Sequence, residues 1–88
     1  MNRSEARDIA DAGLAHISGD GELIAAMLDQ AGADASAIRE MAARPEFSVF
    51  ILDFLMKSDE RLLAFADSAH IPPQRVQMAR AVLGGAEW

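Results

Sequence analysis

Few residues in this 88-residue sequence have the type and spacing that catalysis or metal binding requires. The two histidines, His16 and His70, are far apart, and neither has a second histidine four residues away, so the two-histidine zinc pattern of a helix is missing. The sequence also lacks cysteine, which excludes disulfides, thiolate metal ligands and a cysteine nucleophile. We therefore expect the protein to bind neither a metal nor a cofactor.

Residues 16–22 contain a serine, a histidine and two acids, but their order fits no known reactive loop. A nucleophile elbow has glycines two positions before and two positions after its serine. A calcium loop has oxygen ligands at alternating positions before its glycine. The segment has neither pattern, and we predict a turn between two helices in which Ser18 and Asp20 act as local caps.

The acids of the chain have simpler explanations than acid–base catalysis. Glu5, Asp8 and Asp11 share one face of the first predicted helix, next to arginines, which is typical of a solvated surface. Asp53 is more unusual because it interrupts an apolar segment, and an unpaired buried carboxylate would be costly. We predict that Asp53 is paired, with Lys57 one turn away as the candidate, that it is hydrogen-bonded to the N-terminal turn of a helix, or that it faces solvent. A small enzyme or ligand-binding protein centred on Asp53 is a weaker alternative, and we predict no catalytic residue.

The spacing of apolar residues predicts six short helices and no strand. Serine, aspartate and proline mark the expected helix starts, and glycine or a following proline marks the expected ends. The expected starts are Ser4, Asp20, Asp34 or Ser36, Pro45, Ser58 and Pro72-Pro73. The sequence therefore predicts an all-α, compact helical bundle, with one domain over residues 1–88, a core over 4–84, and a flexible tail at 85–88.

The segment 45–57 is apolar almost all round. A helix of this kind lies at the centre of a core or is partly covered by another subunit. We predict that this helix is central and hidden from water on nearly every side.

A weak internal repeat occurs at a shift of 38 residues, which aligns Glu22 with Glu60 and Asp29 with Asp67. The cap candidates Asp20 and Ser58 align at the same shift. Two repeated three-helix units would explain this pattern. Coincidence among the abundant alanines is the alternative.

The bulk properties favour a cytoplasmic protein. The formal net charge of −6 counts against nonspecific binding to nucleic acid. The first residues carry several charges and lack the apolar run of a signal peptide. No apolar stretch approaches the roughly 20 residues that span a membrane, so we expect no membrane partner.

Residues 58–70 and 73–83 have the spacing of a DNA-binding helix-turn-helix, which is the alternative function. The second helix of this pair offers side chains that could contact bases and phosphates: Gln74, Arg75, Gln77 and Arg80. The negative net charge weighs against this interpretation, and we expect no nucleic-acid partner.

The composition favours a non-catalytic protein-interaction or self-associating module. The chain has five methionines, which adapt to varied partner surfaces. We expect Met78 and Trp88 to be exposed and to contribute to an interaction surface, because methionine and tryptophan are common at interfaces. The expected partner is another protein or a second copy of the chain, as a homodimer.

Apolar residues and turn signals also form a longer pattern along the chain. The segments that carry it are Leu23 to Gly32, the helix of Arg39, Ile51-Leu52-Asp53-Phe54-Leu55, Asp59-Glu60, Leu62-Leu63-Ala64-Phe65, Ile71-Pro72-Pro73, Val76 and Arg80-Ala81. In these segments the sequence resembles a bacterial family of short proteins, domain of unknown function 3572, over residues 9–84. The resemblance implies a compact helical protein and carries no activity, cofactor or catalytic residue.

Overall fold

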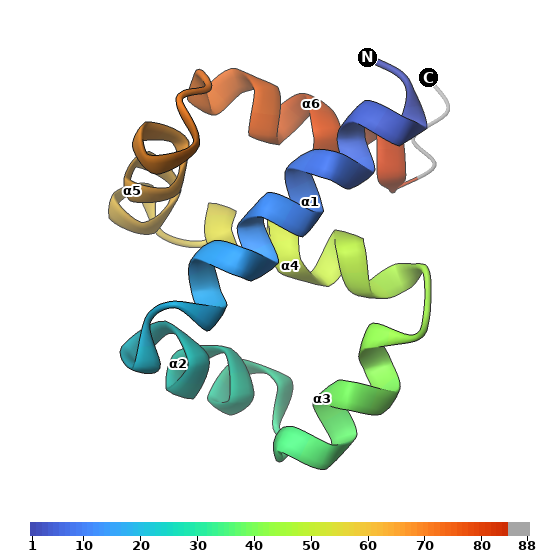
Figure 1. Cartoon of the computed structure of the whole chain (residues 1–88), viewed down its shortest axis with the longest axis vertical. Helices are drawn as coiled ribbons and strands as arrows, with labels where there is room; N and C mark the ends of the chain where they lie inside the picture. Colours follow the sequence, from blue (N-terminus) through green and yellow to red (C-terminus); the bar gives the residue numbers. More distant parts are fainter. Residues whose placement is uncertain (85–88) are drawn as a thin grey trace.

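Six α-helices follow one another in the computed structural model, which describes residues 1–84 (Figure 1). They are α1 (Arg3–Ser18), α2 (Gly21–Ala31), α3 (Ala35–Ala42), α4 (Glu46–Met56), α5 (Asp59–Ala69) and α6 (Pro73–Leu83). The predicted all-α bundle is confirmed. The predicted tail at 85–88 lies outside the described residues.

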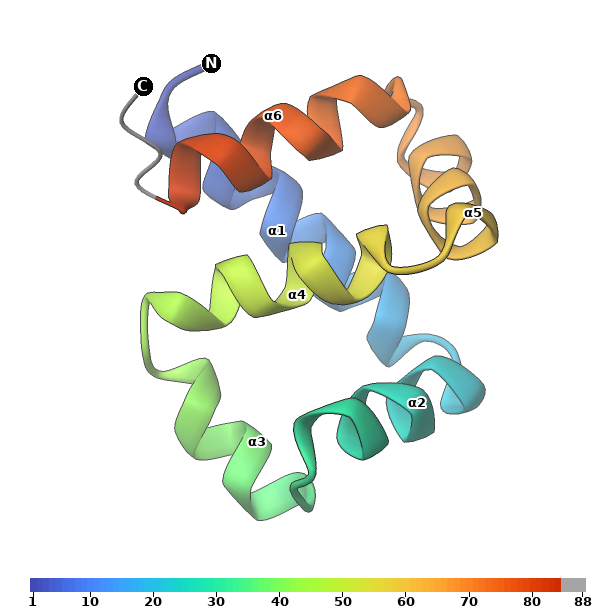
Figure 2. The ribbon, with the colours of Figure 1, turned by 180° about the vertical axis from the view of Figure 1, so that it is seen from behind.

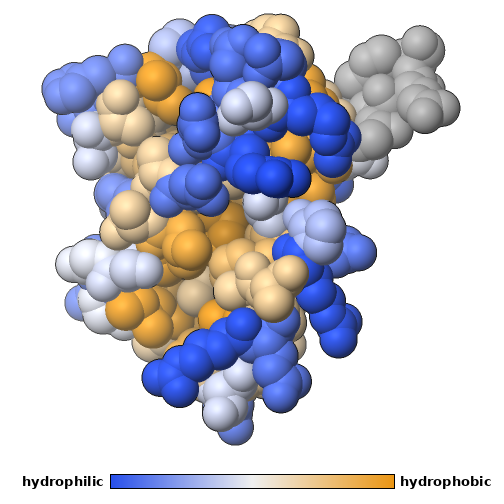
Figure 3. Space-filling view, turned by 45° about the vertical axis from the view of Figure 1, so that its right-hand side comes forward, coloured by the Kyte–Doolittle hydropathy of each residue, from blue (hydrophilic) through white to orange (hydrophobic). Residues whose placement is uncertain are grey.

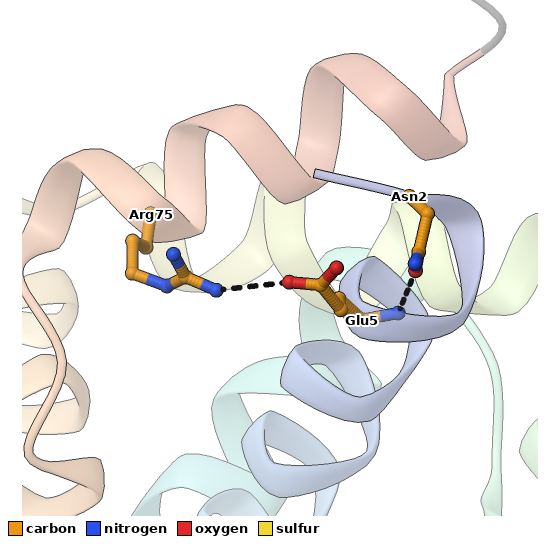
Figure 4. Close-up of polar contacts among 3 residues, drawn as sticks. All are labelled: Asn2, Glu5 and Arg75. Carbon is orange, nitrogen blue, oxygen red and sulfur yellow. Dashed lines mark hydrogen bonds and ion pairs between the residues drawn. The ribbon is translucent and has the colours of Figure 1, made fainter.

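Polar side chains start four of the six helices by accepting a hydrogen bond from a backbone N–H group in the first turn. The predicted caps Asp20, Asp34 and Ser58 are confirmed at α2, α3 and α5. The prediction for α1 is wrong, because Asn2 rather than Ser4 is the cap and its Oδ1 accepts from the Glu5 N–H group at 2.7 Å (Figure 4). Asn2 has the extended backbone that a cap requires, whereas Ser4 already lies inside the helix.

The core is formed mainly where α1, α4 and α6 pack against one another. Helix α4 provides more of the large, fully buried side chains of the core than any other helix, including Leu52, Phe54 and Leu55, none of which is exposed to solvent. Helix α6 contributes Val76 and Ala79, which are equally buried. The predicted central position of this apolar helix is confirmed, although the helix runs over Glu46–Met56 rather than the full 45–57.

Gly13 lies where α1 crosses α4, and it is buried. A Cβ atom at this position would lie 2.8 Å from Leu55 Cδ1 and 3.3 Å from Ile51 Cγ2. Real carbon atoms do not approach this closely without displacing a neighbour. The absence of a side chain at Gly13 is therefore what lets the two central helices approach.

The 38-residue shift seen in the sequence also relates the ends of helices in the structure. Both ends of α2 align with both ends of α5, and each of these helices ends in a residue with left-handed backbone. These residues are Gly32 (φ 64°) and His70 (φ 57°). The two units nevertheless pack differently, since α3 has no buried residue whereas α6 has three.

The two left-handed positions give a prediction on stability. Only glycine adopts this backbone without a steric penalty. Replacing His70 by glycine should therefore raise the free energy of unfolding by about 0.5 kcal/mol, and replacing Gly32 by alanine should lower it by about 1 kcal/mol. Space around a Gly32 Cβ is open, so no clash adds to the second effect. Urea denaturation of both variants tests this, and changes of the same sign would contradict it.

Candidate interaction surface

One stripe of α4 is only partly covered by the rest of the molecule. Glu46 and Lys57 are exposed, and Val49, Phe50 and Asp53 are half-buried. In Figure 2, α1 passes behind α4 and none of the described helices crosses in front of it. The prediction that α4 is hidden on nearly every side is therefore wrong. The reason is that α3, which packs against α4, lies at the edge of the molecule and leaves this stripe open.

Phe50 is at the centre of this stripe. Its ring stacks on the ring of Phe47, with the centroids 6.0 Å apart, while Phe47 itself is buried. Phe50 also lines three separate hollows beside α4, of about 470, 420 and 190 Å³. We use the name Phe50 surface for Glu46, Val49, Phe50 and Asp53 together with the neighbouring Arg7 and Arg80.

The largest of these hollows is lined by both apolar and charged side chains. Val49, Phe50 and Leu83 provide its apolar side chains. Three arginines and two acids line it as well, namely Arg3, Arg7, Arg80, Glu46 and Asp53. The side of the molecule on which α3 joins α4 comes forward in Figure 3, where apolar side chains lie at mid-height between hydrophilic ones above and below.

Asp53 pairs with a residue that is distant in sequence. Arg80 Nε on α6 donates a hydrogen bond to Asp53 Oδ1 at 2.5 Å, so the predicted pairing with Lys57 is wrong. The close packing of α6 on α4 brings Arg80 to the carboxylate. The Asp53 side chain is 47% exposed, and an ion pair this open to solvent contributes at most about 1 kcal/mol. Asp53 is thus neither unpaired nor enclosed.

Of the four residues predicted to contact DNA in the helix-turn-helix alternative, two are in ion pairs within the chain and two are exposed. Arg75 lies 3.5 Å from Glu5 Oε2 on α1 (Figure 4), and Arg80 is held by Asp53. Both arginines are therefore directed at acids of the same chain. Gln74 and Gln77 are exposed on α6.

Of the two residues predicted for an interaction surface, the structure describes one. Met78 lies on α6 with 47% of its surface exposed, and Trp88 lies outside the described residues. Val49 and Phe50 were not among the residues predicted to make contacts. Their outward position could have been recognised from the polar residues Glu46 and Asp53, which fall on the same helical stripe.

No cluster of three histidine, aspartate or glutamate side chains that could hold a metal occurs among residues 1–84. His16 instead lies against the ring of Phe65, at 5.6 Å between centroids. Of the helices that the structure describes, none has the length and apolar character needed to cross a membrane.

Comparison with known proteins identifies a family. The model of a family described as "Protein of unknown function (DUF3572)" matches residues 3–86, which confirms the resemblance noted in the sequence. No curated protein and no solved structure matches the chain.

Proposed function

The chain belongs to the DUF3572 family, whose description assigns no activity, and we propose that it is a non-catalytic protein-interaction module that binds through the Phe50 surface. The observation that carries this proposal is the pair of partly buried apolar side chains, Val49 and Phe50, on the outward stripe of the most apolar helix.

The chemistry of this surface resembles that of known protein interfaces. Protein interfaces are enriched in aromatic residues and arginine, and they place apolar residues at the centre and polar residues at the rim. Here Val49 and Phe50 lie at the centre, while Arg7, Arg80 and Glu46 lie around them. Exposing a phenylalanine is unfavourable in an isolated molecule, and covering it with a partner removes that cost.

The arrangement of charges favours binding over catalysis. A catalytic acid or base works in a partly dry site that shifts its pKa. On the Phe50 surface, the hollow is open and the Asp53 carboxylate is already paired with Arg80. This arrangement suits the rim of an interface.

A photo-crosslinking amino acid at position 49 tests the proposal in the native host. We expect it to form adducts with protein, because Val49 lies at the centre of the contact. The matched control is the same amino acid at Gln77, an exposed position on α6, which should give at most a small fraction of that yield. Adding Phe50→Asp to the position-49 protein should abolish the adduct while circular dichroism shows the helices intact. Equal yields at 49 and 77 would overturn the proposal.

A further inference from the structure

Between Glu46 and Asp53, the outward stripe of α4 has the same chemical order in both directions, and Lys57 follows one turn beyond Asp53. Glu46 precedes Val49 by three residues, and Asp53 follows Phe50 by three. Read from either end, these four residues are acid, apolar, apolar, acid. Two such helices that lie antiparallel would place Val49 and Phe50 of one on Phe50 and Val49 of the other.

Of the two arginines of this surface, Arg80 is the one in an ion pair among the described residues, and it lies at the Asp53 end of the stripe. Arg80 lies beside Asp53, whereas Glu46, at the other end, is exposed and has no ion pair within residues 1–84. A guanidinium group has five N–H donors, so Arg80 can hold Asp53 and still bind a second carboxylate. In an antiparallel pair, that second carboxylate is Glu46 of the other molecule.

We infer that the Phe50 surface binds a second copy of this chain, with the two α4 helices antiparallel about a two-fold axis that passes between Val49 and Phe50. This inference rests on the proposed function and names the partner. Glu46 of each copy meets the Asp53–Arg80 pair of the other, so the contact occurs twice. Such a contact is isologous, in which one surface must be complementary to itself.

The balance of charge is what favours a second copy over a different partner. Three arginines and two acids line the main hollow, so both signs lie next to the apolar centre. A strongly acidic partner, such as nucleic acid, would meet Glu46 and Asp53 as well as the arginines. In a second copy, the acids of one surface lie opposite the arginines of the other.

Paired charge reversals test this geometry by sedimentation equilibrium of the full chain. Glu46→Arg alone should weaken the wild-type dimer at least about tenfold, since its new arginine faces Arg80 of the other copy. Arg80→Glu alone should do the same, since its new glutamate faces Glu46. Mixing the two variants should restore dimers, because arginine at 46 then meets glutamate at 80, and glutamate at 46 meets arginine at 80.

Glu60→Arg is the matched control. Glu60 is an exposed acid in the first turn of α5, just as Glu46 is in the first turn of α4, so its reversal changes the net charge and the helix terminus equally. This variant should remain dimeric. Circular dichroism of all three variants verifies that they are folded, and Glu46→Arg leaves every intramolecular ion pair described here in place.

The outcomes separate the inference from the function on which it rests. A monomeric wild type, or two variants that remain monomeric when mixed, overturns the antiparallel dimer. If the adduct at position 49 then has the mass of a different protein, the Phe50 surface is still a binding surface and only the identity of its partner was wrong. If there is neither a dimer nor an adduct at position 49, both proposals are overturned.

Discussion

Replacing Phe54 by alanine is expected to lower the free energy of unfolding by about 3–5 kcal/mol. Phe54 is completely buried, and the guanidinium carbon of Arg61 lies 4.0 Å from the centre of its ring. The substitution leaves a cavity between helices that have little freedom to close it. Urea denaturation followed by circular dichroism measures the loss. A domain of this size has a total stability of only about 4–13 kcal/mol, so Phe54→Leu, with an expected loss of about 1–2 kcal/mol, provides a variant that stays folded.

Phe50→Ala is the matched control for this prediction. It removes the same side chain from the same helix one turn earlier, but from the half-buried outward stripe. Its cost should be less than that of Phe54→Ala, because Phe50 is only partly buried in the folded protein whereas Phe54 is completely buried. Equal costs would contradict the assignment of an inner and an outer side to α4.

Gly13→Val is expected to lower the free energy of unfolding by about 3 kcal/mol. Its Cβ atom would overlap Leu55 Cδ1, and its two methyl groups would need further space between α1 and α4. Leu55 is fully buried, so a shift of its side chain has to displace other core residues. The stability of Gly13→Ala should fall between that of the wild type and that of Gly13→Val, since alanine gains about 1 kcal/mol in helix propensity but retains the clash at Cβ.

Gly21→Ala separates the clash from the general effect of replacing a helical glycine. No atom lies within 4 Å of a Cβ built on Gly21, in the first turn of α2. This variant should be more stable than the wild type by about 0.4–1 kcal/mol, through the lower entropy of its unfolded chain. Thermal and urea denaturation should thus shift in opposite directions for Gly13→Val and Gly21→Ala. A shift in the same direction would mean that α1 and α4 are not in close contact at Gly13.

The sequence predicted those parts of the fold that depend on neighbouring residues. Asp20, Asp34 and Ser58 cap the helices that follow them because a cap needs only a short polar side chain and the next three residues. Where two suitable caps lie close together, as with Asn2 and Ser4, the local pattern does not distinguish them, and the wrong residue was predicted.

The contacts between distant segments could not be predicted in the same way. A helical pattern suggests Lys57 as the partner of Asp53, because such a pattern shows only which residues lie one turn apart on the same helix. Arg80 reaches Asp53 only through the packing of α6 on α4. Composition also overestimated the burial of α4, because so small a domain has too little chain to enclose a central helix completely.

The lack of buried residues in α3 has a consequence for how binding and folding are coupled. Ile38 and Met41 of α3 are only partly buried against the core, so we expect this helix to unfold locally at a lower cost than α1, α4 or α6. Met41 of α3 lines one of the hollows that Phe50 also lines. A partner that covers this edge binds only the molecules in which α3 is folded, so occupancy of the surface and local protection of α3 rise together.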